Sequence, residues 1–147
     1  MNALEVMLVA AMIADTDPGG LNEPENGATG GFHQLVAPQS AGFPRCRFQE
    51  LDGRVLYSFG GPVASHFFYQ LSFDAVDHPT LGEGAAIAGR LKERAAELFT
   101  DPEGVSVEGH TLLYCRCRGD VPPQAVKKDT EDVYVYTKGM VLELWLA

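Results

Sequence analysis

Two stretches of the chain place apolar residues at the spacing of an α-helix. The first runs from Ala3 to Ala14, where apolar side chains recur every three or four positions, at Leu4, Met7, Leu8, Ala11 and Met12. Asn2 is suited to cap its start, and Glu5 three residues later completes the pattern of a capping box. Further apolar residues occupy most of the remaining circumference, which predicts a helix that must be covered on more than one side.

The second helix is predicted between residues 80 and 101. Its buried stripe is expected to consist of Ile87, Ala88, Leu91, Ala95 and Leu98. Thr80 and Glu83 fit a capping box at its start, and Asp101-Pro102 marks its end.

Alternation of apolar and polar residues predicts strands. It is clearest from His66 to Val76, where every second residue from Phe67 to Ala75 is apolar and the intervening positions are mostly polar. Phe68 interrupts the polar side and is expected to contact a partner. Shorter strands are predicted at residues 32–36, 45–51, 54–59, 105–107, 111–118, 132–137 and 140–146.

Turn residues separate these segments. Asp52-Gly53 predicts a tight hairpin, and a further turn is expected near Lys138-Gly139. Loops are predicted at residues 60–65 and 121–130, and a long flexible loop, rich in Gly, Pro and acidic residues, at about 15–31. The sequence therefore predicts an α+β fold: a single domain over residues 1–147, with a mainly antiparallel mixed sheet and two helices packed on it.

The charge balance narrows the function. The 147 residues include 11 Lys and Arg against 20 Asp and Glu, a net charge of −9. Such a chain is a poor candidate for wrapping a phosphate backbone, because sequence-independent affinity for nucleic acid comes from Lys and Arg, and we expect no sequence-specific nucleic-acid binding. No uncharged apolar stretch approaches the roughly 18 residues of a membrane span, and no signal peptide is recognisable. An odd count of three cysteines then indicates reduced thiols in a cytosol.

Candidate chemistry is sparse. Cys115-x-Cys117, with His110 and Cys46 elsewhere in the chain, lacks the second ligand pair of a zinc site, so buried inert thiols are favoured. Asp74 and Asp77 are expected to be solvated carboxylates at a strand end, with a weak divalent-cation site as the alternative. No nucleophile and base stand at catalytic spacing. The sequence predicts no enzyme activity, no cofactor and no metal.

The scarce basic residues are candidates for subunit contacts. Arg116 and Arg118 would share one face of a strand, opposite Cys115 and Cys117, and Lys127-Lys128 form a second basic pair. The two arginines either pair with nearby acidic residues or meet an acidic patch on another subunit. The predicted subunit or tube interface consists of Arg54, Phe68, Arg116, Arg118, Lys127 and Lys128.

The order of these segments resembles a known family. An apolar N-terminal helix precedes a Gly/Pro-rich acidic loop and then the segment Phe43-Pro44-Arg45-Cys46-Arg47-Phe48. The long strand with Tyr69-Gln70-Leu71-Ser72-Phe73-Asp74-Ala75 leads into an Ala-rich helix, Ala85 to Leu91, and acidic residues at 129–132 open the last strands. This pattern is similar to the tail-terminator and tail-completion proteins of long-tailed bacteriophages and related gene transfer agents. The loop at 15–31 matches no element of that family.

The resemblance implies a structural virion protein that forms a ring, typically of six subunits, at the head-proximal end of the tail tube. Such a ring ends tube polymerisation, joins the tail to the head connector and lets DNA pass through its centre. Its partners would be further copies, the tail tube protein and the connector protein. Its location would be the head–tail junction of the virion, and the host cytoplasm during assembly. Six copies at −9 each would carry about −54, so the lumen would not grip DNA.

Three other readings stay open from the sequence. One is a head-closure or neck protein of similar build. Another is a small metal- or ligand-binding domain, or an enzyme, that uses Cys115, Cys117 and His110. The last is a regulatory dimer of the toxin–antitoxin kind, for which no DNA-reading element is visible.

Overall fold

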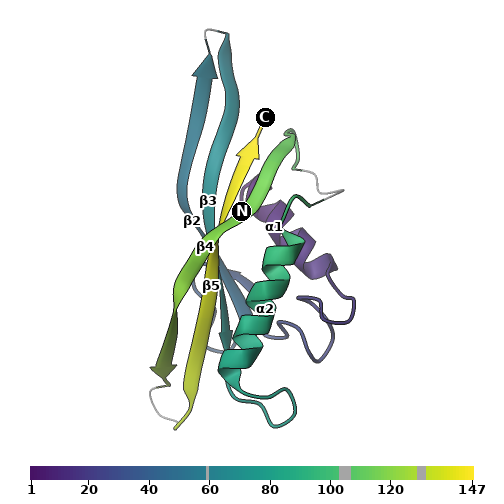
Figure 1. Ribbon diagram of the computed structural model, residues 1–147, viewed down its shortest axis with the longest axis vertical. Helices are drawn as coiled ribbons and strands as arrows, with labels where there is room; N and C mark the ends of the chain where they lie inside the picture. The colour runs from purple at the N-terminus through teal and green to yellow at the C-terminus, as the bar shows by residue number, and fades with distance from the viewer. Residues whose placement is uncertain (59, 103–106, 129–131) are drawn as a thin grey trace.

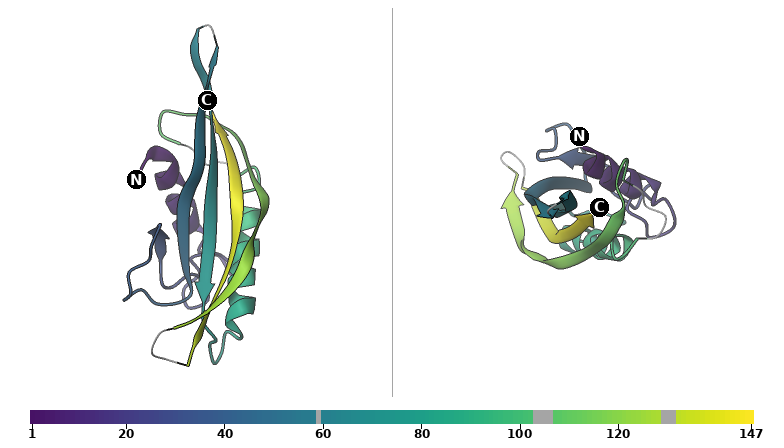
Figure 2. Two further views of the ribbon diagram at one scale, coloured as in Figure 1. Left: turned by 90° about the vertical axis from the view of Figure 1, so that its left-hand side faces the viewer. Right: turned by 90° about the horizontal axis from the view of Figure 1, so that it is seen from above.

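A curved five-stranded sheet with two helices against one face forms the molecule (Figures 1 and 2). The computed structural model describes residues 1–58, 60–102, 107–128 and 132–147. The elements are α1 (Ala3–Ala14), β1 (Phe32–Gln34), β2 (Arg45–Ser58), β3 (Gly61–Ala75), α2 (Gly84–Leu98), β4 (Leu112–Lys127) and β5 (Tyr134–Leu146). The strand order is β1-β2-β3-β5-β4; β1 and β2 are parallel and every other pair is antiparallel. The predicted α+β domain is confirmed.

The core lies between the helices and what we call the inner face of the sheet. Tyr69, Leu71 and Phe73 of β3 are fully buried there, as the predicted alternation requires. In register they pair with β5, where Leu142 lies opposite Tyr69 and Met140 opposite Leu71. Both helices add side chains to this one cluster. On the other face of the sheet, the outer face, the described residues form no helix.

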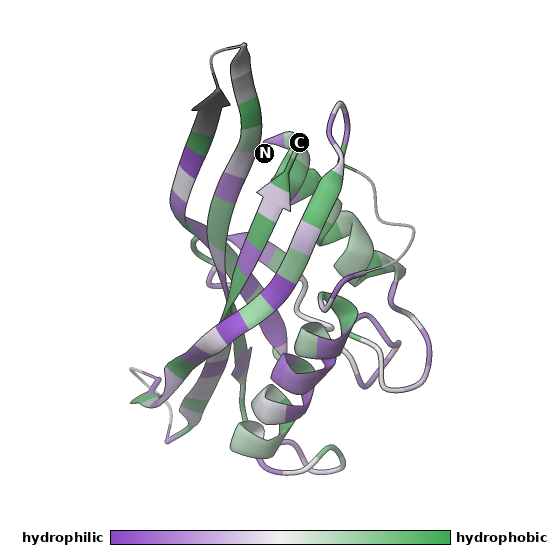
Figure 3. Cartoon of the chain, turned by 45° about the horizontal axis from the view of Figure 1, so that its top comes forward, coloured by the Kyte–Doolittle hydropathy of each residue, from purple (hydrophilic) through white to green (hydrophobic). Residues whose placement is uncertain are grey.

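Helix α1 begins as predicted and is covered on one side only. The Glu5 amide donates to Asn2 Oδ1 at 2.9 Å, and the Asn2 amide donates to Glu5 Oε2 at 3.1 Å, so the capping box is confirmed. Leu8 and Met12 are fully buried, whereas Val6 is 51% and Ile13 49% exposed. Figure 3 shows α1 as apolar along most of its length. A single copy of the chain leaves part of this apolar surface open.

The start of α2 differs from the prediction. Glu83 occupies the cap position but makes no side-chain capping bond, and Thr80 bonds to His78 instead. The carboxylate of Asp77 accepts from the Gly84 amide at 2.8 Å, which satisfies one of the free donors of the first turn. The expected Thr80–Glu83 box is therefore wrong, because a more distant acid reaches the helix start.

The predicted turn at Asp52-Gly53 is also wrong. β2 runs through both residues, and Gly53 lies opposite Phe67 of β3. A side chain at Gly53 would lie 2.9 Å from the Phe67 ring, so the glycine provides space and not a reversal of the chain. A register shift between Glu50 and Asp52 absorbs the irregularity. β3 starts at Gly61, so most of the predicted loop at 60–65 is strand, and residue 59 lies outside the described residues.

The last two strands are longer than predicted. β4 continues to Lys127 through Pro122 and Pro123, which an edge strand tolerates at a register shift between Val121 and Gln124. The predicted loop at 121–130 is therefore wrong as far as the structure describes it, up to residue 128. β5 begins at Tyr134 and continues through Lys138-Gly139, so the predicted turn there is also wrong. Residues 105, 106, 129 and 130 of these predictions lie outside the described residues, and Val107 forms only an isolated bridge with His110.

The segment at 15–31 joins α1 to β1 without a helix or strand of its own. Its Asp15 carboxylate accepts from Arg94 of α2, at 2.9 Å from Nε and 2.5 Å from Nη2. Leu21 is fully buried, and Arg90 donates to the Asn26 carbonyl oxygen at 2.7 Å. These contacts tie the segment to α2. Neither helix of the described residues is long and apolar enough to cross a bilayer.

Gly139 tests how closely β3 and β5 approach. A Cβ at this position would lie 2.7 Å from the Leu71 carbonyl oxygen, which is backbone and cannot rotate away. We expect Gly139→Ala to lower the free energy of unfolding by about 1–3 kcal/mol, the usual range for overpacking, in urea titrations. Gly119→Ala in β4 is the matched control, because no atom lies within 4 Å of its added Cβ. Equal stability of the two variants would contradict this explanation.

Candidate assembly surfaces

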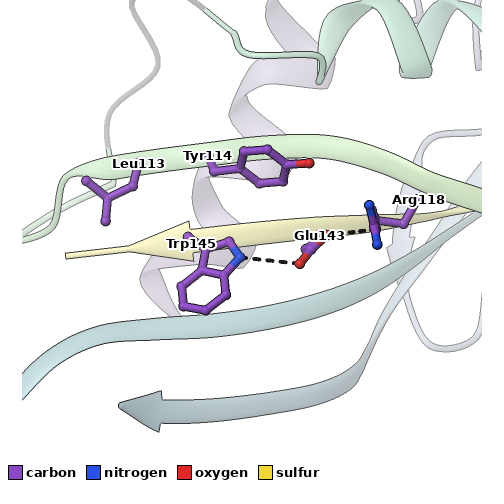
Figure 4. Close-up of a pocket in the computed structure, with 5 residues that line it drawn as sticks. All are labelled: Leu113, Tyr114, Arg118, Glu143 and Trp145. Carbon is purple, nitrogen blue, oxygen red and sulfur yellow. Dashed lines mark hydrogen bonds and ion pairs between the residues drawn. The ribbon is translucent and has the colours of Figure 1, made fainter. Parts of the chain in front are cut away.

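A shallow hollow of about 400 Å³ lies on the outer face, between β4 and β5 (Figure 4). Leu113, Tyr114, Arg118, Glu143 and Trp145 line it. Glu143 is its centre: Oε1 accepts from Trp145 Nε1 at 3.3 Å and lies 2.8 Å from His66 Nε2, and Oε2 lies 2.9 Å from Arg118 Nε. These polar groups engage one another, so the hollow is organised before anything binds.

Aromatic rings extend the hollow across β3. The His66 ring stacks on Trp145 with centroids 4.0 Å apart, and Phe68 lies against His66 at 4.7 Å. Trp145 and Phe68 are half-buried and His66 is held from two sides. A rigid aromatic surface with a few fixed polar groups is typical of a protein contact. The Glu143 carboxylate already holds two side-chain nitrogens and lies against Arg118, so it is poorly placed to act as a base.

Arg116 and Arg118 share the outer side of β4, as predicted, and both have acidic partners within the chain. Arg116 donates to Asp101 at 2.8 Å and lies over the Tyr114 ring at 5.2 Å. The Asp101 hydrogen bond raises the pKa of Arg116 above its ordinary value. Arg118 pairs with Glu143. Local pairing of the two arginines, one of the two readings from sequence, is thus present in the single chain.

A second feature of the outer face is a groove of about 300 Å³ at the end where β4 stops and β5 begins, here called the basic groove. Its floor is a buried acid. The Asp74 side chain is 3% exposed and receives Arg47 Nε at 2.7 Å and Nη2 at 3.0 Å, Arg45 Nε at 3.1 Å, and Thr137 Oγ1 at 2.7 Å. Lys127 and Lys128 of the β4 end also line the groove.

Asp74 is the opposite of the solvated carboxylate that the sequence predicted. Burial alone would raise the pKa of its carboxyl, but hydrogen bonds from Arg47, Thr137 and Arg45 outweigh it and hold the pKa below the ordinary value. Asp74 is therefore occupied by protein donors, whereas Asp77 is exposed and uses Oδ1 to cap α2. Within the described residues, no group of three His, Cys, Asp or Glu could hold a metal.

The three cysteines do not come together. Cys46 on β2 and Cys115 on β4 are buried at separate places in the sheet, with β3 and β5 between their strands. Burial raises the pKa of both thiols, that of Cys115 to about 12. Cys117 is half-buried, and its thiol contacts the Gly119 carbonyl oxygen at 3.8 Å. The buried thiols of Cys46 and Cys115 are therefore poor nucleophiles and poor metal ligands.

The structure divides the predicted interface residues among three places. Phe68 and Arg118 belong to the hollow, with Arg116 at its rim, and Lys127 and Lys128 line the basic groove. Arg54 stands apart on the β2–β3 hairpin, 72% exposed and paired with Asp52 at 3.2 Å. Sequence reasoning missed the groove arginines and the cluster of His66, Glu143 and Trp145. The alternation of residues along each strand predicts which face of the sheet these side chains occupy, but not which side chains from other strands they contact.

The β2–β3 hairpin is the third surface. It extends well past the rest of the sheet (Figure 1). Leu51 is 48%, Val55 46% and Val63 53% exposed on it. Exposed apolar residues on a projecting hairpin are unusual for a chain that works alone. The hairpin therefore has the composition of a contact with another protein.

Comparison with known proteins adds a fold relationship. No protein-family model matches the chain, and no curated protein matches it in sequence. Among solved structures, a chain from the virion of a native gene transfer agent particle is similar, with a TM-score of 0.64 and 13% identity. The similarity covers 97% of this chain and 93% of that chain. At this identity the match establishes a shared fold.

The Asp74 cluster gives a pH-dependent prediction. A carboxyl whose folded pKa is depressed stabilises the fold above its unfolded pKa, and this stabilisation is lost as pH falls through the folded pKa. Asp74→Asn should lower the free energy of unfolding at pH 7 by about 3 kcal/mol, because it leaves two half-buried guanidiniums without their acceptor. The difference from wild type should shrink as pH falls below 3.8, the ordinary pKa of the group.

Urea titrations at about pH 7, 5, 3 and 2 measure this difference, because the loss lies between the ordinary pKa and the lower folded pKa. The control is Asp52→Asn, which removes the exposed partner of Arg54 and should cost at most about 1 kcal/mol at every pH. A pH-independent difference for Asp74→Asn would show that the carboxylate charge is not what stabilises this part of the sheet.

Proposed function

We propose that this protein is a structural component of a phage-like virion, and that it forms a ring at the head-proximal end of a tail tube. The observation that supports the proposal most is the shared fold: nearly the whole chain superimposes on nearly the whole of a chain from a gene transfer agent virion. The element order that suggested the tail-terminator family from sequence is in keeping with this. In that role the protein ends tube polymerisation and joins the tail to the head connector.

The surfaces of the single chain support an assembling protein. α1 exposes Val6 and Ile13, and the hairpin exposes Leu51, Val55 and Val63. The hollow presents aromatic rings fixed by Glu143. We assign the hairpin with Arg54, the hollow with Phe68, Arg116 and Arg118, and the basic groove with Lys127 and Lys128 to contacts with further copies, the tube protein or the connector protein. In a ring each of these contacts recurs at every subunit, so modest contact energies accumulate.

The same proposal includes no catalysis, no cofactor and no specific reading of nucleic acid. The carboxylates of Asp74 and Glu143 are held by donors, and the pKa of the buried Cys115 thiol is raised to about 12. The net charge of −9 suits a ring whose lumen DNA must pass without being gripped. The protein would then act at the head–tail junction, after assembly in the host cytoplasm.

Loss of the protein separates the terminator role from its nearest alternative. In the particle-producing cell, deletion of the coding sequence should give tail tubes of uncontrolled, excessive length without attached heads, seen by negative-stain electron microscopy. A head-closure or neck protein would instead leave tails of normal length that fail to join heads. Normal-length tails in the deletion strain would therefore refute the terminator role while leaving a structural role in place.

Native mass spectrometry tests the ring itself. The 15.9 kDa chain should give a species of about 95 kDa, six subunits, at high protein concentration. Leu51→Asp with Val55→Asp should leave the monomer folded by circular dichroism, because both side chains are exposed, and should reduce attachment to the tube. A protein that stays strictly monomeric at every concentration would contradict a self-assembling ring.

A further inference from the structure

The basic groove is unusual because the chain is acidic. Four of its 11 basic residues, Arg45, Arg47, Lys127 and Lys128, line one groove of about 300 Å³, and Asp74 is the acidic residue among its lining. Asp74 is 3% exposed and lies beneath the arginines, whereas Lys127 is 57% exposed and pairs with Asp132 at 3.2 Å. Among the described residues, four cations against Asp74 and Asp132 leave the groove with a net positive charge. Exposed Val36 and Val126 on its walls add apolar surface, which favours a protein segment over a bare phosphate.

The segment at 15–31 offers the complementary charge. The carboxylate of Glu23 is used within it, accepting from the Gly19 amide and from Asn26. Asp17 and Glu25 are exposed, and within the described part of the chain neither carboxylate has an ion-pair partner. The backbone that carries them is held by the Asp15–Arg94 pair and by buried Leu21, so the two acids are presented on an anchored support.

The two features lie on opposite sides of the molecule. The groove opens on the outer face of the sheet, through Arg45, Arg47 and Thr137. The acidic segment packs on α2, which covers the inner face, through Arg94 and Arg90. Figure 1 shows the helices and their connecting loops on one side, and the end of β4 with the start of β5 on the other. A contact between opposite sides of identical subunits is head-to-tail, the kind that closes into a ring when its rotation permits.

We propose that the acidic segment of one copy, through Asp17 and Glu25, docks in the basic groove of the next copy. This inference rests on the proposed ring and identifies the contact that builds it. It also gives a role to the one segment that matches no element of the resembled family. Complementary patches on opposite sides let a chain of net charge −9 associate, since the attraction acts at the contact while the remaining charge is screened over about 8 Å.

Charge exchange between the two patches tests the contact. A groove variant, Lys127→Glu with Lys128→Glu, and a segment variant, Asp17→Lys with Glu25→Lys, change exposed side chains and should fold normally. Each alone should weaken self-association by roughly tenfold or more, because attraction becomes repulsion. Mixed one to one, the variants should reassemble as an alternating ring, since each reversed patch now meets a reversed partner. A single chain with all four changes should also assemble.

Sedimentation velocity at low and high salt and native mass spectrometry provide the measurement. The control Glu83→Lys with Glu108→Lys makes the same net charge change as the segment variant, at exposed acids outside the segment, and should assemble like wild type. If wild type forms rings and neither reversal weakens them, or if mixing restores nothing, the contact is wrong while the ring stands. If wild type forms no oligomer at all, both the proposed ring and the proposed contact are wrong. Wild-type binding to a labelled DNA duplex that the groove variant loses would assign the groove to phosphate and overturn the proposal.

Discussion

One buried carboxylate, that of Asp74, holds the sheet together at the end where its basic groove lies. It sits on β3, accepts from Arg45 and Arg47 of β2 on one side, and accepts from Thr137 of β5 on the other. A carboxylate in so dry a site is tolerated only when several donors replace its lost water, and here four hydrogen bonds do so. The same bonds fix two guanidiniums over the outer face, where Phe43 lies against Arg45 at 4.4 Å. The arrangement that lets the strand bury an acid thus also fixes positive charge at the surface of an acidic protein.

Helices and strands with strong periodicity could be predicted from the sequence, but the structural role of individual glycines could not. The spacing in α1 and the alternation in β3 each follow from one continuous face against the core, so local patterns sufficed. The sequence predicts turns at Gly53 and Gly139 because glycine permits backbone conformations that other residues avoid. Both lie inside strands, where the missing side chain makes room for Phe67 and for the Leu71 backbone. A sequence shows that a glycine is present but not which of its two properties is used.

For the candidate surfaces, the sequence predicted which face of a strand a residue occupies, but not which residue it contacts. Alternation placed Arg116 and Arg118 on the side of β4 away from Cys115, which the structure shows. Their partners, Asp101 and Glu143, come from elsewhere in the chain and depend on strand register, which the sequence did not reveal. The register also places Arg45 opposite Asp74. Asp74, which the sequence predicts to be a solvated carboxylate, is therefore buried and holds strands together. Residues whose role depends on a distant strand are those that sequence reasoning missed.

In the proposed ring, charge must serve two opposed demands. DNA in the lumen requires a surface that does not attract phosphate, and the subunit contacts require attraction between copies that each carry −9. Uniform mixing of the 11 basic residues would weaken both, because it would make the lumen less acidic and leave every contact slightly repulsive. Gathering four of them in a groove beneath which Asp74 is hidden separates the demands in space. Because screening limits each charge to its neighbourhood, a local positive patch can hold the next copy while the acidic remainder of the surface faces the DNA path.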